Sequence, residues 1–428
     1  MMSSELFAYL DGEAIGVIGQ SAGGALSFTY DPDYRSRRDA TPLSLSMPLV
    51  RAGHKNKAVR AFLQGLLPDS PGRLAELGRE YRVSASNPFA LLSHIGRDAA
   101  GAVQLLPPGE ASADAAERHG DVRELSEADF AELVADLVRN GDTWGRRADD
   151  ARWSLPGAQP KVALFRTEQE QWAVPQDSTP TTHILKPAVA PYPDHHINEF
   201  MTMAAARELR LHVADDFLVT TERGHAVFVS TRYDRRLEDG RWHRLHQEDL
   251  CQTLSVPPDM KYQSEGGPGV AAIARLINSL PDAEDRRGNA RQFYEALVFS
   301  VASLGTDAHA KNYSLLLQRD RAKLAPLYDL GSYAPYLAAD GGDPKLAMSI
   351  EGEYSVGRIS LDSLVRVAAR VGLDRDWAEA RAHEITDGIV IAYAAAADAA
   401  RAQLGDDPFV GRMVDSIHEY ASSRGWNV

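Results

Sequence analysis

The sequence predicts an α+β fold with two lobes, in which a sheet-rich N-lobe precedes an all-helical C-lobe. Short apolar segments rich in β-branched residues follow one another between residues 152 and 235, a pattern typical of strands. Beyond about residue 245, apolar residues recur at helical spacing. The 428 residues suffice for two or three domains, and 44% hydrophobic with 25% charged residues is typical of a globular protein.

The N-terminal region predicts strands followed by helices. Apolar and polar residues alternate around "DGEAIG" and "SAGG", which indicates strands joined by tight turns. Amphipathic helices are expected within 58–81 and after Asn87, where Asn87 is the cap and Pro88 occupies the first turn. Residues 106–121, rich in Pro, Ala and charge, predict a linker.

The rest of the chain supplies the two predicted lobes. A helix over 126–139 is expected to begin after Ser126 as its cap. The predicted strands are "KVALFR", "QWAVP", "THILKP", "DFLVTTE" and "HAVFVSTRYD", and the helix "INEFMTMAAARELRL" interrupts them. The predicted C-lobe helices are "HQEDLCQTLS", "VAAIARLINSL", "ARQFYEALVFSVAS", "LDSLVRVAARVG" and the alanine-rich stretch 377–404. Long Gly/Pro loops such as "SVPPDMKYQSEGGPGV" lie between them, and such loops are often functional.

Composition excludes several classes of protein. A net charge of -14 and a pI near 5.4 argue against non-specific wrapping of nucleic acid, which needs many basic residues. The single cysteine, Cys251, excludes an internal disulfide framework and is expected to be a buried, inert thiol. No signal peptide is visible, and no stretch approaches the roughly 20 apolar residues of a membrane span. We therefore expect a cytoplasmic protein without membrane contact.

The segments "TDAHAKN" and "PLYDLGS" concentrate polar residues after an apolar helix. Four residues separate Asp307 from Asn312, and the intervening "YSLLLQRDRAKLA" predicts a hairpin that returns Asp329 to Asn312. Asp and Asn oxygens are hard ligands suited to Mg²⁺, while Asp307 is placed to accept the proton of an attacking hydroxyl. Each of these residues, taken singly, is equally consistent with a role in a turn.

Two residues of the N-lobe complement this group. Lys186 ends an apolar strand, where its charge could meet a phosphate, and Glu199 begins the next helix, within reach of Lys186. The alternatives are a solvated lysine and a first-turn acid that favours the helix dipole. The loop in "SLPGAQPKVAL" has one glycine and matches neither of the two common phosphate-loop patterns. His243 and His246 lack a third metal ligand nearby, so surface or helix-capping roles are expected.

Together these motifs resemble the HipA family of serine/threonine kinase toxins. The motifs, in chain order, are "SLPGAQPK", "PTTHILKP", "NEF", "RYDR", "QEDLCQ", "KYQSEGGPG", "TDAHAKNYS", "PLYDLGS" and "KLAMSI". Nearer the N-terminus, "LSLSMPL", "FLQGLLPDSPGR" and "LLSHIGRDAAGAVQLLP" resemble the family's N-terminal subdomain. The resemblance extends from about residue 5 to 420. It implies a bilobal kinase-like fold with an extra N-terminal subdomain over 1–110, an N-lobe over 111–240 and a C-lobe over 241–428.

The resemblance also assigns roles to residues of this sequence. It implies that Asp307 is the catalytic aspartate, that Asn312 and Asp329 bind Mg²⁺, and that Lys186, supported by Glu199, binds the ATP phosphates. Ser154 is similar in position to the family's autophosphorylated serine. Modification of that serine ejects the loop of "SLPGAQPKVAL" (154–164), called the glycine loop below, and stops the kinase. The remaining ATP-binding residues are expected in the glycine loop, the hinge and the catalytic loop: Gly157, Ala158, Thr231, Arg232, Tyr233, His309 and Lys311. Relatives often have Glu-Arg-Phe at the hinge, where this sequence has Thr231, Arg232 and Tyr233, so the side-chain contact of that Glu is absent here. Lys311 is equally consistent with a solvated lysine of the loop.

The partners follow from the resemblance alone. Family members typically phosphorylate an aminoacyl-tRNA synthetase, often the glutamyl one, and halt translation. A helix-turn-helix antitoxin, HipB, neutralises them and joins them to operator DNA, so DNA contact is expected to be indirect. Two other functions stay open at this point. One is an inactive ATP-binding co-repressor, and the other is a small-molecule or lipid kinase, although no basic juxtamembrane patch supports the lipid version.

Overall fold

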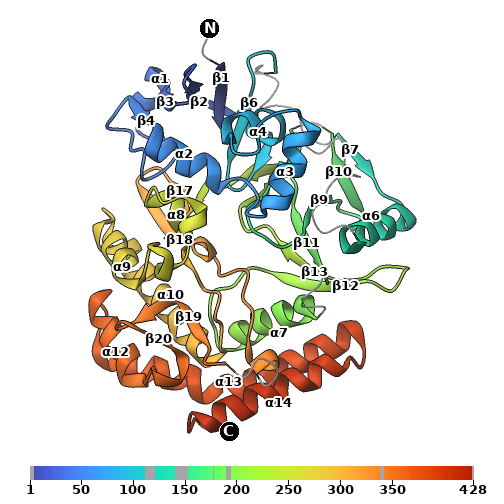
Figure 1. Ribbon diagram of the computed structural model, residues 1–428, viewed down its shortest axis with the longest axis vertical. Coiled ribbons are helices and arrows are strands. Elements are labelled where there is room, and N and C mark those ends of the chain that lie inside the picture. Colours follow the sequence, from blue (N-terminus) through green and yellow to red (C-terminus); the bar gives the residue numbers. More distant parts are fainter. Residues whose placement is uncertain are drawn as a thin grey trace.

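The computed structural model describes residues 4–110, 121–139, 153–176, 178–188, 194–337 and 342–426. The chain forms three parts, each around its own hydrophobic cluster (Figure 1). The N-terminal part lies at one end of the molecule, and the last helices lie at the other. Most of the predicted linker over 106–121 lies outside the described residues.

The N-terminal part is an antiparallel sheet with helices packed on it. Its strand order is β4-β3-β2-β1-β6. The strands are β1 (Ser4–Leu10), β2 (Glu13–Gln20), β3 (Leu26–Tyr30), β4 (Gly53–Lys55) and β6 (Val103–Leu106). The helices are α1 (Pro32–Ser36), α2 (Asn56–Gly65), α3 (Pro71–Glu80) and α4 (Pro88–Ile95). The cap predicted for α4 is confirmed, because the Asn87 side chain accepts a hydrogen bond from the Ala90 N–H.

The second part is built on a six-stranded antiparallel sheet. Its strand order is β12-β13-β11-β9-β10-β7, and the five strands predicted from the sequence are all present. The strands are β7 (Val122–Glu124), β9 (Val162–Arg166), β10 (Trp172–Pro175), β11 (His183–Pro187), β12 (Asp216–Thr220) and β13 (Ala226–Thr231). Helix α6 (Glu127–Arg139) packs in the same hydrophobic cluster, and Ser126 caps it through the N–H of Asp129. A separate hairpin follows, formed by β14 (Arg235–Glu238) and β15 (Arg241–Arg244).

The C-lobe is mostly helical but not entirely so, which corrects the prediction of an all-helical lobe. Its helices are α8 (Leu250–Thr253), α9 (Val270–Ser279), α10 (Ala283–Ala302), α12 (Leu361–Arg370), α13 (Arg375–Leu404) and α14 (Pro408–Ser423). Short 3-10 turns occur at Pro258–Met260, Gln263–Glu265, Ala310–Asn312, Ala334–Tyr336 and Val356–Arg358. Two small sheets accompany them, formed by β16 (Gln247–Asp249), β17 (Ser314–Gln318) and β18 (Arg321–Leu324), and by β19 (Lys345–Ile350) and β20 (Glu353–Ser355).

The first of these sheets, β16-β17-β18, has a physical cause. The predicted hairpin β17–β18 is confirmed, and its free edge pairs with residues 247–249 as a third strand. The helix expected over "HQEDLCQTLS" is therefore short, beginning only after Asp249, whose side chain caps it. Strands of three residues are too short to produce a period-two pattern in the sequence.

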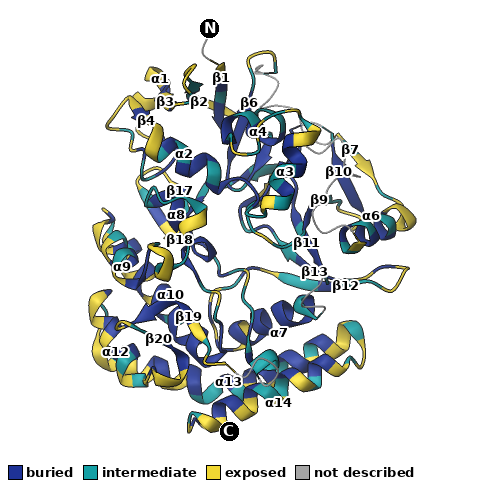
Figure 2. Cartoon of the chain, in the orientation of Figure 1, coloured by how far each residue is buried: buried dark blue, intermediate teal, exposed yellow. Residues whose placement is uncertain are grey.

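Helix α7 (His195–Glu208) joins the sheet of the second part to the C-lobe. All of its residues from 196 to 206 are buried, as Figure 2 also shows. It packs against the alanine-rich α13, whose small side chains allow close approach of the two helices. None of the helices in the described part of the chain is long and apolar enough to span a membrane.

Candidate active site between the lobes

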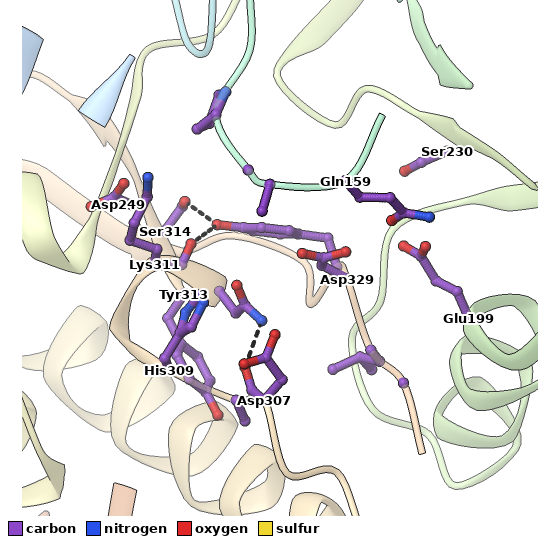
Figure 3. Close-up of a pocket in the computed structure, with 18 of the residues that line it drawn as sticks. Gln159, Glu199, Ser230, Asp249, Asp307, His309, Lys311, Tyr313, Ser314 and Asp329 are labelled. Atoms are coloured by element: carbon purple, nitrogen blue, oxygen red, sulfur yellow. Dashed lines mark hydrogen bonds between the residues drawn. The ribbon is translucent and has the colours of Figure 1, made fainter. Parts of the chain in front are cut away.

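One cavity of about 650 Å³ receives residues from all three parts of the molecule. Figure 3 shows the residues that the second part and the C-lobe contribute, among them Gln159, Glu199, Asp307 and Asp329. The N-terminal part contributes the loop between α2 and α3, and the second part contributes the glycine loop, β11 and the segment after β13. Helix α7 lines the cavity, as do the segments 305–314 and 328–333 of the C-lobe. Every residue for which a role in catalysis, metal binding or nucleotide binding was expected lines this cavity; Ser154 alone does not.

Helix α10 ends abruptly at the cavity, and this places Asp307. Leu304 adopts a left-handed φ of 55°, and the Gly305 N–H donates to the Ser300 carbonyl at 2.7 Å, which terminates the helix. The Asn312 side-chain N–H donates to the Asp307 carbonyl at 2.9 Å and closes the loop. Because Nδ2 makes that bond, and Oδ1 of Asn312 accepts none within the described residues, Oδ1 is the atom available for a cation. Asn312 therefore closes its own loop through the side-chain nitrogen, not through the oxygen as in the turn role considered above, and still presents that oxygen.

Lys186, Glu199 and Asp329 form one ion network across the cavity. The Lys186 ammonium lies 2.6 Å from Oε1 of Glu199 and 2.6 Å from Oδ1 of Asp329, so Lys186 is not a solvated lysine. Asp329 has a left-handed φ of 57°, uncommon for a residue other than glycine and frequent at functional sites. Burial opposes the charge on all three residues. At Lys186 and Asp329 the attraction of the opposite charges outweighs the effect of burial. The pKa of Lys186 is therefore raised, and that of Asp329 is lowered well below its usual range.

The charged form of Glu199 is not favoured, unlike those of Lys186 and Asp329. Burial raises its pKa to about 7, and the lowering by Lys186 does not offset this. Its second oxygen, Oε2, is buried without a hydrogen-bond partner in the described part of the chain. The carboxyl group is therefore close to its titration point at neutral pH, where an approaching phosphate or cation would change its charge.

The glycine loop holds a second lysine that the sequence did not single out. Lys161 is buried beside the cavity, and its ammonium donates to the Pro156 carbonyl at 3.1 Å. Burial and then the charge of Lys186 lower its pKa to about 8. Gly157 has a φ of 107°, and a Cβ there would lie 2.5 Å from the Lys161 nitrogen. Glycine is therefore required at this turn, while Ala158 lines the cavity beside it.

Asp69 ties the N-terminal part to the loop 305–312, which carries Asp307 and Asn312. Its carboxylate pairs with Lys311 and, at 3.1 Å, with Lys261, while its backbone N–H donates to the Gly157 carbonyl at 3.0 Å. Lys311 is thus a buried residue in an ion pair, and the alternative of a solvated loop lysine is wrong. Asp69 was missed because "LLPDSPGR" contains no chemical pattern, and its contact to Lys311 spans 242 positions.

The predicted hinge offers one backbone donor to a ligand. The N–H groups of Thr231 and Arg232 already donate, to the carbonyls of Asp215 and Thr182. Within the described chain no group accepts from the Tyr233 N–H. The Tyr233 ring lies against that of Tyr328, with centroids 5.6 Å apart.

The Arg232 guanidinium does not serve the cavity but a buried charge cluster. It makes two hydrogen bonds to Asp234, at 2.8 and 3.0 Å, and one to the Ala99 carbonyl of the N-terminal part. Arg235 and Arg244 join the cluster through Asp98. Breaking such a buried pair costs about 3–5 kcal/mol, so the cluster fixes the hinge against the N-terminal part.

Ser154 lies in a buried strand and does not line the cavity, although the next residue, Leu155, does. Residues Trp153–Ser154 form β8, which pairs in parallel with β5 (Asp98–Ala99), and the Ser154 side chain is about 1% exposed. Its hydroxyl donates to the Leu66 carbonyl at 2.7 Å. The glycine loop is thereby attached to the N-terminal part at both Ser154 and Gly157.

The histidines and the cysteine have structural surroundings. His309 is buried with its ring edge against Tyr262, and burial lowers its pKa. His243 lies in β15 and bonds Asp11, and His246 is buried against the Leu43 carbonyl, so the helix N-terminus expected there is wrong. Cys251 is buried as predicted, and burial raises the pKa of its thiol. Among the described residues, no group of three His, Cys, Asp or Glu side chains could hold a metal.

Comparisons with known proteins agree with this geometry. Residues 153–393 match the family model of the HipA-like C-terminal domain, and residues 6–106 match that of the HipA N-terminal domain. The chain is 33% identical over 420 residues to the Sinorhizobium fredii protein named "Putative kinase Y4mE", with 96% of each chain covered. It is 30% identical over 376 residues to the serine/threonine-protein kinase toxin HipA of Shewanella oneidensis, covering 84% of this chain and 82% of that protein.

A solved structure extends the likeness to three dimensions. The HipA chain in the complex of Shewanella oneidensis HipA, HipB and operator DNA superimposes with a TM-score of 0.81 at 25% identity, covering 99% of this chain and 100% of that one. Fold and sequence thus define a serine/threonine protein kinase, an enzyme that uses ATP. The chain belongs to the HipA family.

Proposed function

We propose that this kinase transfers the γ-phosphate of Mg·ATP to a serine or threonine of a target protein, as the toxin of a HipA/HipB-like module. The main support is that Lys186, Asp329, Asp307 and Asn312 come from both lobes and line one cavity. In this proposal Asp307 orients the acceptor hydroxyl and takes its proton, while Lys186, held by Glu199, meets the ATP phosphates.

The metal assignment rests on the donor atoms. Oδ1 of Asn312 and the carboxylate of Asp329 are hard oxygens on the same cavity, which fits Mg²⁺. Bound Mg²⁺ would neutralise charge on the phosphates. Lys161 and Lys311 add positive charge beside it, and Gly157 and Ala158 leave room for phosphate oxygens.

The other end of the nucleotide is assigned to the hinge. The N–H of Tyr233, which has no acceptor among the described residues, is suited to the edge of a purine, within the segment Thr231 to Tyr233. The Arg232 side chain supports this segment from behind, in the buried charge cluster, so its contribution to ATP binding is indirect. His309 lines the same cavity near Asp307.

The biological role is proposed from the relatives. The HipA chain of Shewanella oneidensis forms a complex with HipB and operator DNA, which supports a HipB-like helix-turn-helix antitoxin as partner and indirect contact with DNA. The net charge of -14 favours DNA contact through that antitoxin. We propose an aminoacyl-tRNA synthetase, the glutamyl enzyme first, as the phosphorylated target in the cytoplasm, with growth arrest as the result.

The test is phosphate transfer from labelled ATP to purified glutamyl-tRNA synthetase and to a degenerate serine/threonine peptide library. Transfer to the synthetase supports the whole proposal. Transfer to the peptide library alone supports a protein kinase and contradicts the synthetase as its target. ATP binding without transfer to either acceptor would indicate the co-repressor. Asp307→Asn is the matched control, since transfer that persists in this variant comes from a contaminating kinase.

A further inference from the structure

The Gly/Pro loop over 257–269 has a single, tightly built conformation beside the cavity. Two 3-10 turns shape it, and Gly266 closes the second with a φ of 95°. A Cβ on Gly267 would lie 2.0 Å from the Met260 carbonyl oxygen, so the backbone passes where only glycine fits. The Gly267 N–H donates to the Tyr262 carbonyl at 2.9 Å. This loop therefore holds its side chains in defined places.

Three consecutive side chains of the loop contact three distant parts of the chain. Lys261 pairs with Asp69 of the N-terminal part at 3.1 Å. Gln263 makes two hydrogen bonds to Ser349 of β19, one through each atom of its amide, at 2.9 Å each. Tyr262, between them, is thus fixed from both sides.

The Tyr262 hydroxyl donates to Oδ1 of Asp307 at 2.6 Å. Burial first, and then the charge of Asp307, raise the pKa of Tyr262, so the phenol stays protonated and acts as the donor. The ring lies edge-on to His309, with centroids 5.0 Å apart, which fixes its orientation. Within the described residues, Oδ2 of Asp307 has no hydrogen-bond partner.

We propose that Tyr262 is a positioning residue, which holds one oxygen of Asp307 so that the other faces the acceptor hydroxyl. Because Asp307 is exposed, its carboxylate would otherwise rotate, and small errors of placement cost large factors in rate. The loop 257–269 then forms a wall of the acceptor site. This inference rests on the proposed role of Asp307 as the catalytic base.

The test is Tyr262→Phe, which removes the hydroxyl and keeps the ring on His309. We expect kcat for phosphorylation of the degenerate serine/threonine peptide library to fall about 10- to 100-fold. The KM for ATP and the calorimetric affinity for Mg·ATP should stay within about twofold, because no ATP ligand is removed. The control Tyr354→Phe makes the same chemical change in β20, away from the cavity, and should leave kcat unchanged.

A second variant guards against a merely structural effect. Gln263→Ala releases the loop from Ser349 without changing a contact of Asp307. We expect kcat to fall less than in Tyr262→Phe, and the KM for ATP to stay unchanged again. An unchanged or increased kcat in Tyr262→Phe overturns the inference, and an increase would mean that the phenol blocks the acceptor position. Parallel losses of kcat, ATP affinity and thermal midpoint overturn it too, since they indicate lost structure. If the wild-type protein transfers no phosphate, the proposed function is contradicted, and this inference with it.

Discussion

The Lys186 ammonium lies 2.6 Å from Oδ1 of Asp329, although 143 positions separate the two residues. Lys186 is the next-to-last residue of β11 in the sheet-rich part, and Asp329 follows β18 of the C-lobe. The contact therefore joins the two lobes at the cavity. Because both residues gain from the pair, with the pKa of Lys186 raised and that of Asp329 lowered, the closed arrangement stabilises both charges.

Two substitutions separate chemistry from nucleotide binding. Asp307→Asn should reduce phosphate transfer about 10²- to 10⁴-fold and leave Mg·ATP affinity within twofold, because it removes only the proposed base. Asp329→Ala should lower Mg·ATP affinity at least about tenfold, a loss of about 1.4 kcal/mol, because it removes the proposed metal ligand while Glu199 still holds Lys186. Calorimetric titration and transfer assays on both variants check this. Wild-type affinity in Asp329→Ala, or full transfer in Asp307→Asn, would contradict the site assignment.

Glu199 should make stability depend on pH. Burial raises its pKa from 4.5 to about 7, so between these values the folded chain keeps a proton that the unfolded chain has lost. Its contribution is therefore fully present below pH 4.5 and is lost as the pH rises through about 7. Glu199→Gln cannot ionise, so its stability relative to wild type should rise from pH 5 to pH 8.

Urea unfolding of both proteins at several pH values measures this difference. Glu208→Gln, an exposed carboxyl on the same helix, is the control and should follow wild type. Parallel curves for wild type and Glu199→Gln would show that Glu199 does not titrate in this range.

Lys161 should take up a proton when Mg·ATP binds. Its pKa is lowered to about 8, so near pH 8 about half of the molecules without nucleotide hold it neutral. Phosphates in the cavity favour the charged form and raise the pKa. Calorimetry at pH 8 in two buffers of different ionisation enthalpy should detect an uptake approaching half a proton. Lys161→Met should remove most of this uptake, since Glu199, with a pKa of about 7, is already largely ionised at pH 8, and the exposed Lys323→Met should keep it. Equal binding enthalpies in the two buffers for wild type would contradict the prediction.

The sequence predicted what depends on neighbouring residues. The strand that ends at Lys186, the helix that begins near Glu199 and the hairpin that returns Asp329 all follow from local periodicity and turn signals, and the structure contains them. Lys161 is part of the motif "SLPGAQPK", but a single lysine in a sequence does not indicate that its side chain is buried.

The contacts missed are those that only tertiary packing creates. Asp69 meets Lys311 and Lys261 because the loop between α2 and α3 reaches the cavity, and no local pattern encodes that approach. The buried cluster around Arg232 was equally hidden, since only its contact with Asp234 is local, while its second acidic partner, Asp98, lies 134 positions away. Charged residues of this kind look like surface residues in a sequence, because charges are seldom buried unless paired.

Phosphorylation of Ser154 should open the site. A phosphate adds a charge of about -1.5 to -2, which the buried space beside the Leu66 carbonyl cannot accommodate. We therefore expect β8 to leave β5, and the glycine loop, bonded at Gly157 to Asp69, to leave with it. Because Lys161 lines the cavity from this loop, ATP affinity should fall.

Two substitutions and a mass measurement test this last prediction. Ser154→Glu should lower Mg·ATP affinity at least about tenfold and expose Lys161 to trypsin, because the added carboxylate is not tolerated in the buried strand. Ser154→Ala is the matched control. It leaves the Leu66 carbonyl without its partner, a cost of about 1–3 kcal/mol in stability, but should keep ATP affinity and resistance to trypsin. Intact-mass measurement after incubation with Mg·ATP should show one phosphate on the wild type and none on Ser154→Ala. Ser154→Glu that binds ATP as tightly as Ser154→Ala would mean that the loop stays docked despite the charge.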